Sequence, residues 1–312
     1  MKDVASVYPK IYPHNSNFKV APFQAWVRSG GGVVSPHYKL WPLHIFLDLL
    51  EGILPKSKTQ ARLIFAEPPS LSFDSFPSYG HYEIIPVLWD CWPYLYEKTM
   101  QWFLKHRVRS AIFTSSQTAK EFKKRFPDMN ILAITEGIET DMYCGNKRLS
   151  DRSIDFLCFG RVCDGLDIDS FPREVSVLKS RNEQGVLSTR SELIRALSDS
   201  KITFCVPRCD NQPEIAGGVE TLTQRYWECM LSGIVIVGRA PQELIDLIGY
   251  NPIVPANHAN IACVVNDVLS HIDDYQFLVE KNREYATNYA SWDIRIRKIR
   301  EWLREVGYKI GN

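Results

Sequence analysis

The sequence lacks a strong excess of charge of either sign: its 312 residues carry 37 Lys and Arg against 36 Asp and Glu, a formal net charge of +1. A protein held on nucleic acid by phosphate attraction is usually far more basic, so we expect no nucleic-acid partner. The sequence also lacks an uncharged apolar run of ~18 residues, which excludes a membrane-spanning helix. Its first residues contain no apolar signal core, which favours a cytoplasmic location.

Paired metal-binding motifs are missing as well. The eight cysteines include no Cys-x-x-Cys pair, and Cys205 and Cys209 have no second pair at zinc-ligand spacing. The seven histidines form no His-x-x-x-His or His-Glu-x-x-His pattern. We therefore expect no metal, no cofactor, and eight reduced cysteines that pack as small apolar residues.

The remaining composition is that of a globular protein with a full core. Hydrophobic residues make up 45% of the chain and charged residues 23%, and its length predicts about two domains. The polar stretch 144–155 is the best candidate for a linker. We accordingly expect an acceptor-side domain over 1–148 and a second domain over 149–312.

Both halves alternate short apolar runs with amphipathic stretches, which predicts parallel strands covered by helices. In the first half we expect strands at 61–67, 83–90, 109–116 and 130–135, with helices at 94–106 and 117–126. In the second half we expect strands at 154–161, 201–207, 234–238 and 251–254. Helices are predicted there at 191–200, 221–233, 241–249, 260–271, 274–289 and 291–306. In open parallel sheets ligands bind at the carboxyl ends of the strands, so a cleft between the two domains is the expected site.

The most informative segment runs from Gly217 to Gly238. Its two acidic residues, Glu220 and Glu228, lie before and inside a predicted helix whose amino end offers unpaired N–H groups, a natural seat for a diphosphate. Gly218 would let the loop approach that ligand closely, and the N–H groups near Thr221, Leu222 and Thr223 would face it. The deeper carboxylate of Glu228 could accept hydrogen bonds from a ribose diol.

This segment resembles the Glu-x7-Glu motif of retaining glycosyltransferases of the GT-B fold, particularly the family-4-like enzymes. The resemblance covers roughly 89–302 and is strongest over 202–254, where the acidic helix closes in Met-Leu-Ser-Gly and the run from Ala240 to Val254 follows. It implies an α/β fold of two Rossmann-like domains facing a cleft, with a C-terminal helix crossing back to the first domain. It also implies a nucleoside-diphosphate-sugar donor held by the second domain, an acceptor held by the first, and no metal requirement.

By resemblance, Gly160 and Arg161 lie at the donor phosphates, Glu228 at the ribose and Glu220 at the transferred sugar. Two features depart from the family pattern: Arg225 stands where a proline is usual, and the lysine expected a few residues after Arg161 is absent. Arg225 could contact a phosphate or brace the loop. The missing charge could come from Arg208, Arg173 or Lys179.

Asp90 is the candidate catalytic side chain of the first half, together with Glu220 and Arg161 of the second. It ends an apolar strand between Trp89 and Trp92, where aromatic rings could stack on sugars and a carboxylate could orient an acceptor hydroxyl. The alternative is that Asp90 caps the helix that begins near Pro93.

The sequence thus predicts a hexosyltransferase acting on a glycan, lipid-linked or protein hydroxyl, as in polysaccharide biosynthesis. A non-catalytic nucleotide-sugar or glycan-binding protein and a sugar-nucleotide epimerase of the same fold are the alternatives. The amphipathic stretch 40–54, with the basic runs 105–109 and 120–126, could contact the inner face of a membrane peripherally. The same stretch could equally be a core helix beside solvated basic faces.

Overall fold

The computed structural model describes residues 1–9, 19–36, 38–50, 54–143, 147–160, 166–182, 185–187 and 189–311. The chain divides into two compact units. The first comprises Met1–Gly137, Glu214–Val219 and Trp292–Asn312, and the second comprises Ile138–Pro213 and Glu220–Ser291. The boundary predicted at 148 and 149 lies later in the chain than this division.

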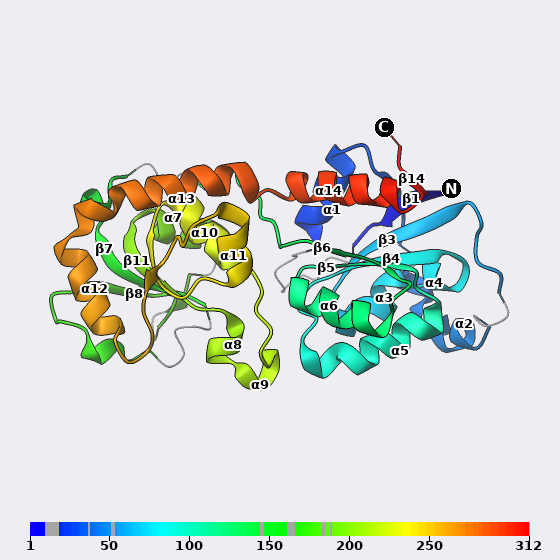
Figure 1. Ribbon diagram of the computed structural model, residues 1–312, viewed down its shortest axis with the longest axis horizontal. Coiled ribbons are helices and arrows are strands. Elements are labelled where there is room, and N and C mark those ends of the chain that lie inside the picture. Colours follow the sequence, from blue (N-terminus) through cyan, green and yellow to red (C-terminus); the bar gives the residue numbers. More distant parts are fainter. Residues whose placement is uncertain are drawn as a thin grey trace. The chain divides into compact units, whose positions relative to one another are not determined.

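The first unit is built on a seven-stranded sheet whose neighbouring strands all run parallel (Figure 1). Its main path has the order β14-β1-β3-β4-β5-β6, and β2 pairs with β1. The strands are β1 (Lys2–Val7), β2 (Gly32–Val34), β3 (Gln60–Ala66), β4 (Glu83–Leu88), β5 (Ser110–Phe113), β6 (Asn130–Ala133) and β14 (Tyr308–Lys309). The four strands predicted in this half correspond to β3, β4, β5 and β6.

Helices cover both faces of this sheet, which explains why its central strands are apolar throughout. Alternate residues of β3 point to opposite faces: Leu63 joins a cluster with Trp26 and Ile299, and Ile64 joins a cluster on the other face. The α-helices of this unit are α1 (Val20–Arg28), α2 (His44–Leu50), α3 (Leu71–Ser75), α4 (Ser78–His81), α5 (Tyr96–His106), α6 (Ser116–Arg125) and α14 (Trp292–Glu305). Its 3₁₀ turns are η1 (Tyr38–Leu43), η2 (Pro68–Ser70) and η3 (Pro93–Leu95).

The second unit contains a five-stranded parallel sheet of order β13-β12-β11-β7-β8 and a small antiparallel pair, β9 with β10 (Figure 1). The strands are β7 (Ile154–Cys158), β8 (Val177–Lys179), β9 (Arg181–Asn182), β10 (Gly185–Val186), β11 (Ser200–Cys205), β12 (Val235–Gly238) and β13 (Val254–Pro255). Apolar clusters lie on both faces of the sheet, one around Trp227 and the other around Phe204.

The α-helices between Gly137 and α14 are α7 (Arg190–Ser198), α8 (Arg208–Asn211), α9 (Pro213–Ala216), α10 (Gln224–Ser232), α11 (Gln242–Ile248), α12 (Ile261–Ser270) and α13 (Gln276–Tyr289). The 3₁₀ turns are η4 (Leu149–Asp151), η6 (Ile168–Ser170) and η7 (Ile272–Tyr275). The helix predicted at 221–233 begins three residues later, because Thr223 is its extended N-cap. Within the described residues, no helix combines the length and apolar character that a bilayer crossing requires.

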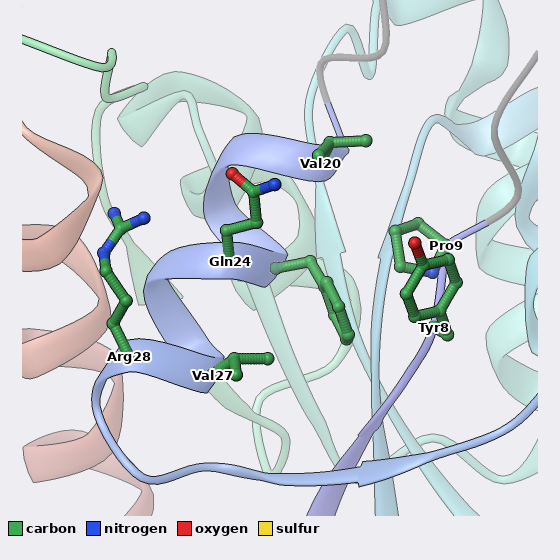
Figure 2. Close-up of a pocket in the computed structure, with 7 residues that line it drawn as sticks. Tyr8, Pro9, Val20, Gln24, Val27 and Arg28 are labelled. Carbon is green, nitrogen blue, oxygen red and sulfur yellow. The ribbon is translucent and has the colours of Figure 1, made fainter.

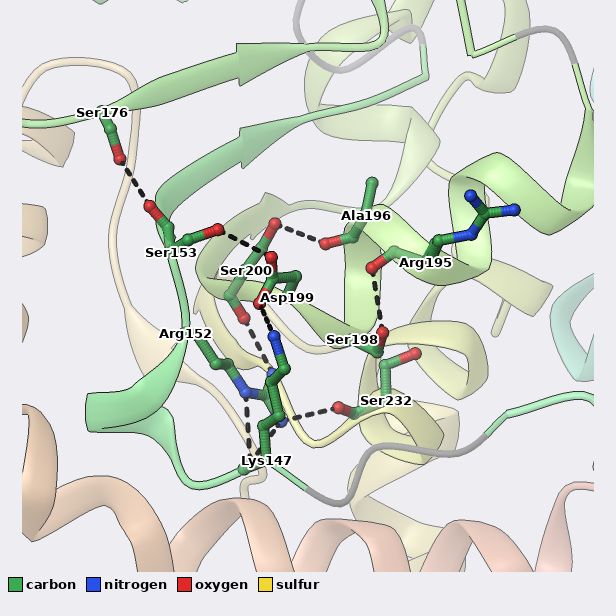
Figure 3. Close-up of polar contacts among 10 residues, drawn as sticks. All are labelled: Lys147, Arg152, Ser153, Ser176, Arg195, Ala196, Ser198, Asp199, Ser200 and Ser232. Atoms are coloured by element: carbon green, nitrogen blue, oxygen red, sulfur yellow. Dashed lines mark hydrogen bonds and ion pairs between the residues drawn. The ribbon is translucent and has the colours of Figure 1, made fainter.

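The buried side chain of Arg152 joins three segments of the second unit by hydrogen bonds (Figure 3). Its guanidinium donates to the backbone oxygens of Ser200 (2.8 Å), Ser232 (3.0 Å) and Lys147 (3.2 Å). The side chain therefore joins the chain before β7 to the start of β11 and the carboxyl end of α10. Burial lowers the pKa of Arg152 to about 10, against an opposing effect of Asp199.

One cysteine prediction is wrong. Cys158, at the end of β7, is disulfide-bonded, and its partner lies outside the described residues. Cys91, Cys205, Cys209, Cys229 and Cys263 are free thiols, as expected. The position of Cys158 in an apolar run of the sequence indicated only a packing role. Spacing along the chain cannot show which other cysteine pairs with it.

Candidate functional site

Several of the predicted donor residues lie in segments that follow the strands of the second unit's sheet. Strands β7, β11 and β12 are parallel neighbours, so the loops that follow them meet at one edge. Gly160 follows β7, the segment from Val206 to Thr223, which includes α8 and α9, follows β11, and Arg239 follows β12. Helix α10 begins at this edge, with Thr223 as a cap whose side chain makes no capping hydrogen bond.

Gly160 and Arg225 lie directly against one another. Gly160 has a φ of +70°, and a Cβ added there would overlap Arg225 Nη2. The guanidinium also lies 5.3 Å from the centre of the Phe159 ring. In the described part of the chain, no carboxylate lies within ion-pair distance of Arg225, so a cation stands uncompensated beside the amino end of α10. Arg161 lies outside the described residues.

Glu228 lies one turn further along α10, and one of its two carboxylate oxygens accepts a hydrogen bond from within the chain. Tyr143 Oη donates to its Oε1 at 3.0 Å, and Arg190 Nη2 donates to Tyr143 Oη at 3.2 Å. The Glu228 side chain is 14% exposed. Burial, with a contribution from Glu228, raises the pKa of Tyr143, so its hydroxyl keeps its proton and remains a donor. Sequence reasoning missed Tyr143 and Arg190, because neither stands near Glu228 along the chain.

Glu220 is engaged at both oxygens. Arg239 Nη1 pairs with its Oε1, and the backbone N–H of Gln242 donates to its Oε2 at 3.0 Å. Arg239 also pairs with both carboxylate oxygens of Asp210 at 2.6 Å. The hydrogen bond to Asp210, followed by those to Glu220, raises the pKa of Arg239 above its usual value. The predicted contact of Glu220 with a sugar thus involves a carboxylate that already has partners.

The carboxylate of Glu243 links the same two segments in the opposite direction, from α11 to the loop before α10. Glu243 Oε2, in the first turn of α11, accepts from the backbone N–H of Leu222 at 3.1 Å. The loop before α10 and the start of α11 are therefore linked twice, through Glu220 and through Glu243. Of the N–H groups expected to face a ligand, that of Leu222 has an acidic partner within the chain. Thr221 and Leu222 are both buried.

The other predicted donor residues are more dispersed. Arg208 Nε, at the start of α8, donates at 3.0 Å to Oε1 of Gln212, the residue that follows this helix. Gly218 is exposed with open space where a side chain would stand. Of the alternative cations, Arg173 and Lys179 are exposed, and Lys179 ends the edge strand β8. No group of three or more metal-ligating side chains is found among the described residues.

Asp90 follows β4 at the carboxyl edge of the first unit's sheet. Its φ is +50°, a left-handed conformation that non-glycine residues seldom adopt and that often marks functional sites. Beside it, Trp89 Nε1 donates to Glu67 Oε1, after β3, at 3.3 Å. The alternative prediction for Asp90 is wrong: the residue at the N-cap position before Pro93 is Trp92.

A surface pocket of about 350 Å³ adjoins the end of β1 in the same unit (Figure 2). Tyr8 and Pro9 form one side of it, and the α1 residues Val20, Phe23, Gln24, Val27 and Arg28 form the other. The Tyr8 ring packs edge-on against Phe23, with ring centres 5.0 Å apart. Sequence reasoning gave no sign of this pocket, because β1 itself was not predicted.

No family model matches the chain, and no curated protein matches it. Solved structures do. HepE from Anabaena, in complex with UDP-glucose, aligns with a TM-score of 0.61 at 11% identity, over 97% of this chain and 99% of that one. The sucrose-phosphate synthase of Thermosynechococcus elongatus aligns with a TM-score of 0.62 at 12% identity, over 98% and 99%.

A putative UDP-N-acetylglucosamine 2-epimerase from Listeria monocytogenes aligns with a TM-score of 0.52 at 9% identity, over 96% and 95%. At such identities the similarity establishes the fold alone. The chain has the α/β fold of two parallel-sheet domains found in these structures, the GT-B fold.

Proposed function

We propose that this chain is a hexosyltransferase. It takes a sugar from a nucleoside-diphosphate donor and transfers it to a hydroxyl of a glycan, lipid-linked or protein acceptor. The reaction retains the anomeric configuration and needs neither metal nor cofactor. The fold supports this proposal, because HepE, which shares it, was solved with UDP-glucose bound.

The observation that carries the proposal is the environment of Glu228. Tyr143 holds its Oε1, and no described residue makes a hydrogen bond to its Oε2. A carboxylate that is 14% exposed, fixed at one oxygen and open at the other, can accept from a vicinal diol. The ribose of a nucleotide presents such a diol.

The diphosphate is proposed to lie between Arg225 and the amino end of α10. Arg225 has no acidic partner within the described residues, and Gly160 leaves room for its guanidinium. Without a metal, the charge that develops on the leaving diphosphate must be stabilised by such cations and N–H donors, each contributing about 3–4 kcal/mol in the transition state. Arg161 and Arg208 remain proposed contributors.

Glu220 is proposed to contact the transferred sugar from a fixed position. Its pairing with Arg239 and with the amino end of α11 orients the carboxylate, so a sugar hydroxyl would add a partner to a group that is already rigid. Asp90 and Trp89, on the first unit, are proposed to orient the acceptor hydroxyl. In a retaining enzyme Asp90 would position this hydroxyl instead of deprotonating it.

The direct test is donor hydrolysis by the purified protein. Incubation with UDP-, GDP- and ADP-sugars should release free sugar and nucleoside diphosphate slowly from one of them. Because free sugar mutarotates, the anomeric configuration is read by NMR from the glycoside formed with a simple alcohol acceptor and should be that of the donor. The rate should not change with EDTA. Inversion, or a strict dependence on a divalent ion, would contradict the mechanism, and tight binding with no turnover would favour a non-catalytic binding protein.

A sugar-nucleotide epimerase is the second candidate, because the Listeria protein shares the fold. The same incubation separates the two. An epimerase would return a nucleotide still attached to an altered sugar, whereas a transferase would release nucleoside diphosphate.

We further propose that the protein is cytoplasmic.

A further inference from the structure

A short segment of the first unit, η1 and α2, exposes an unusual number of large apolar side chains. Leu40, Leu43, Ile45, Phe46 and Leu49 are between 47% and 74% exposed. We refer to these five residues as the apolar surface. Single exposed apolar residues are ordinary, whereas five within ten positions form a patch of the kind that marks an interaction site.

The apolar surface points outward because other side chains of the same segment are anchored inward. Trp41 packs edge-on against Phe73 and Phe76, with ring centres 4.9 and 5.4 Å away. Leu47 packs against the cluster on this side of the sheet. Asp48 accepts from Tyr79 Oη at 2.7 Å and from Lys105 Nζ at 2.7 Å. With these three positions turned in, positions 45, 46 and 49 of α2 face the opposite side.

Helix α5, which is joined to this segment, and helix α6, which packs against α5, are strongly basic. Residues 96–125, which include α5 and α6, contain eight Lys and Arg against two Glu. All eight basic residues are exposed: Lys98, Lys105, Arg107, Arg109, Lys120, Lys123, Lys124 and Arg125. The Lys105–Asp48 pair joins α5 to α2, and Phe103 and Phe122, with ring centres 5.4 Å apart, join α5 to α6.

We propose that the apolar surface, together with the basic helix α5 joined to it and α6 behind that helix, docks the protein onto an anionic phospholipid membrane. Apolar side chains on a short helix enter the boundary between headgroups and acyl chains, and nearby Lys and Arg are attracted to anionic headgroups. The pairing of Asp48 with Lys105 reduces the repulsion that a free carboxylate would add.

Charge complementarity selects this occupant over a second copy of the chain. A two-fold dimer through the apolar surface would bring the same basic helices of both copies together, which raises the electrostatic energy of the pair. An anionic bilayer offers these cations the opposite charge. The inference does not depend on the proposed transferase activity.

The test is co-sedimentation of the purified protein with vesicles. Binding should be strong to vesicles of phosphatidylcholine with phosphatidylserine, weak to phosphatidylcholine alone, and reduced by added salt. The variant Phe46→Ser/Leu49→Ser should lower the partition coefficient at least about tenfold. The variant Lys98→Gln/Lys120→Gln should lower it about fivefold or more for the anionic vesicles.

Phe277→Ser is the matched control. Phe277 is 75% exposed on α13 of the second unit, so this variant removes an equally exposed ring away from the apolar surface and should bind like the parent. All variants change exposed residues, and circular dichroism should show unchanged folding. Equal binding by parent and Phe46→Ser/Leu49→Ser, or no binding to anionic vesicles, would overturn the proposal. A parent dimer that this variant dissociates, without vesicle binding, would assign the surface to a second copy instead.

Discussion

Glu228 is the residue whose surroundings say most about ligand binding. Arg190 and Tyr143 form a chain of donors that ends on one of its oxygens. That chain fixes the carboxylate, and no described residue bonds to its other oxygen, where the proposed ribose diol would bind. The sequence alone placed Glu228 on a helix, and it could not show that Tyr143, 85 positions away, orients it.

The first residue-scale prediction concerns Glu228→Ala. Hydrogen bonds to a charged group contribute about 1.5–3 kcal/mol, so affinity for the matching nucleoside diphosphate should fall about tenfold to a hundredfold. Isothermal calorimetry measures this directly. Glu284→Ala, on an exposed position of α13, is the control and should bind normally. Unchanged affinity in Glu228→Ala would remove the ribose contact from the proposal.

The second residue-scale prediction concerns Gly160→Ala. The left-handed backbone should cost about 1 kcal/mol of unfolding free energy, and the new Cβ should displace the Arg225 guanidinium and weaken diphosphate binding. Gly249→Ala is the matched control, because Gly249 has a φ of +80° but open space around it. Urea unfolding should show similar losses in both variants, whereas calorimetry should show weaker binding only in Gly160→Ala. Equal affinities would show that Arg225 does not contact the phosphates.

At the scale of elements, polar side chains also fasten the second unit's sheet across its strands. Asp155 of β7 accepts from Lys201 of β11 at 2.7 Å and from the backbone N–H of Ser176, before β8, at 2.9 Å. Burial alone would raise the pKa of Asp155, but the hydrogen bonds from Lys201 and Ser176 outweigh it and hold the pKa below its usual value.

A pH dependence follows from the sign of that shift. Because the pKa of Asp155 is lower folded than unfolded, its contribution to stability is present above the unfolded pKa of about 4. It is lost as pH falls through the folded value. Asp155→Asn should therefore reduce the melting temperature at pH 7, and the difference from the parent should shrink below about pH 4. Asp169→Asn, at an exposed position, should leave the whole profile unchanged. A constant difference across the pH range would contradict the assignment.

At the scale of the whole molecule, the last residues of the chain complete the unit formed by the first. Helix α14 packs against α1, and β14 pairs with β1 in parallel. Ile296, Ile299 and Leu303 are fully buried in the cluster that holds Trp26 and Leu63. The first unit therefore cannot complete its core until the chain has been synthesised almost to its end.

The corresponding prediction concerns Ile299→Ala, which should lower the unfolding free energy by about 2–5 kcal/mol. Hydrogen exchange read by mass spectrometry should show lost protection in β3, β4 and β5, with protection in β11 and β12 retained. Lys298→Ala, at the exposed neighbouring position, should stay within about 0.5 kcal/mol of the parent. Equal loss of protection in both sheets would mean that the two units unfold as one.

Local patterns in the sequence determined the class of fold and most of its elements. Alternating apolar runs and amphipathic stretches predicted β3, β4, β5, β6, β7, β11 and β12 because burial on a sheet or helix face leaves a period along the chain. The acidic helix and its preceding glycine loop were predicted from residues close together in the sequence, and Arg225 was singled out because it departs from the pattern of the family that the segment resembles. Strand β1 was not predicted because Lys2, Asp3 and Ser6 interrupt its apolar pattern.

The tertiary structure alone decided which groups meet. The ties from Arg239 to Asp210 and Glu220, from Tyr143 to Glu228, and from β14 to β1 join residues far apart along the chain. The outward direction of the apolar surface depends on where Trp41, Leu47 and Asp48 find partners. Such contacts are set by packing in three dimensions, and a one-dimensional period carries no record of them.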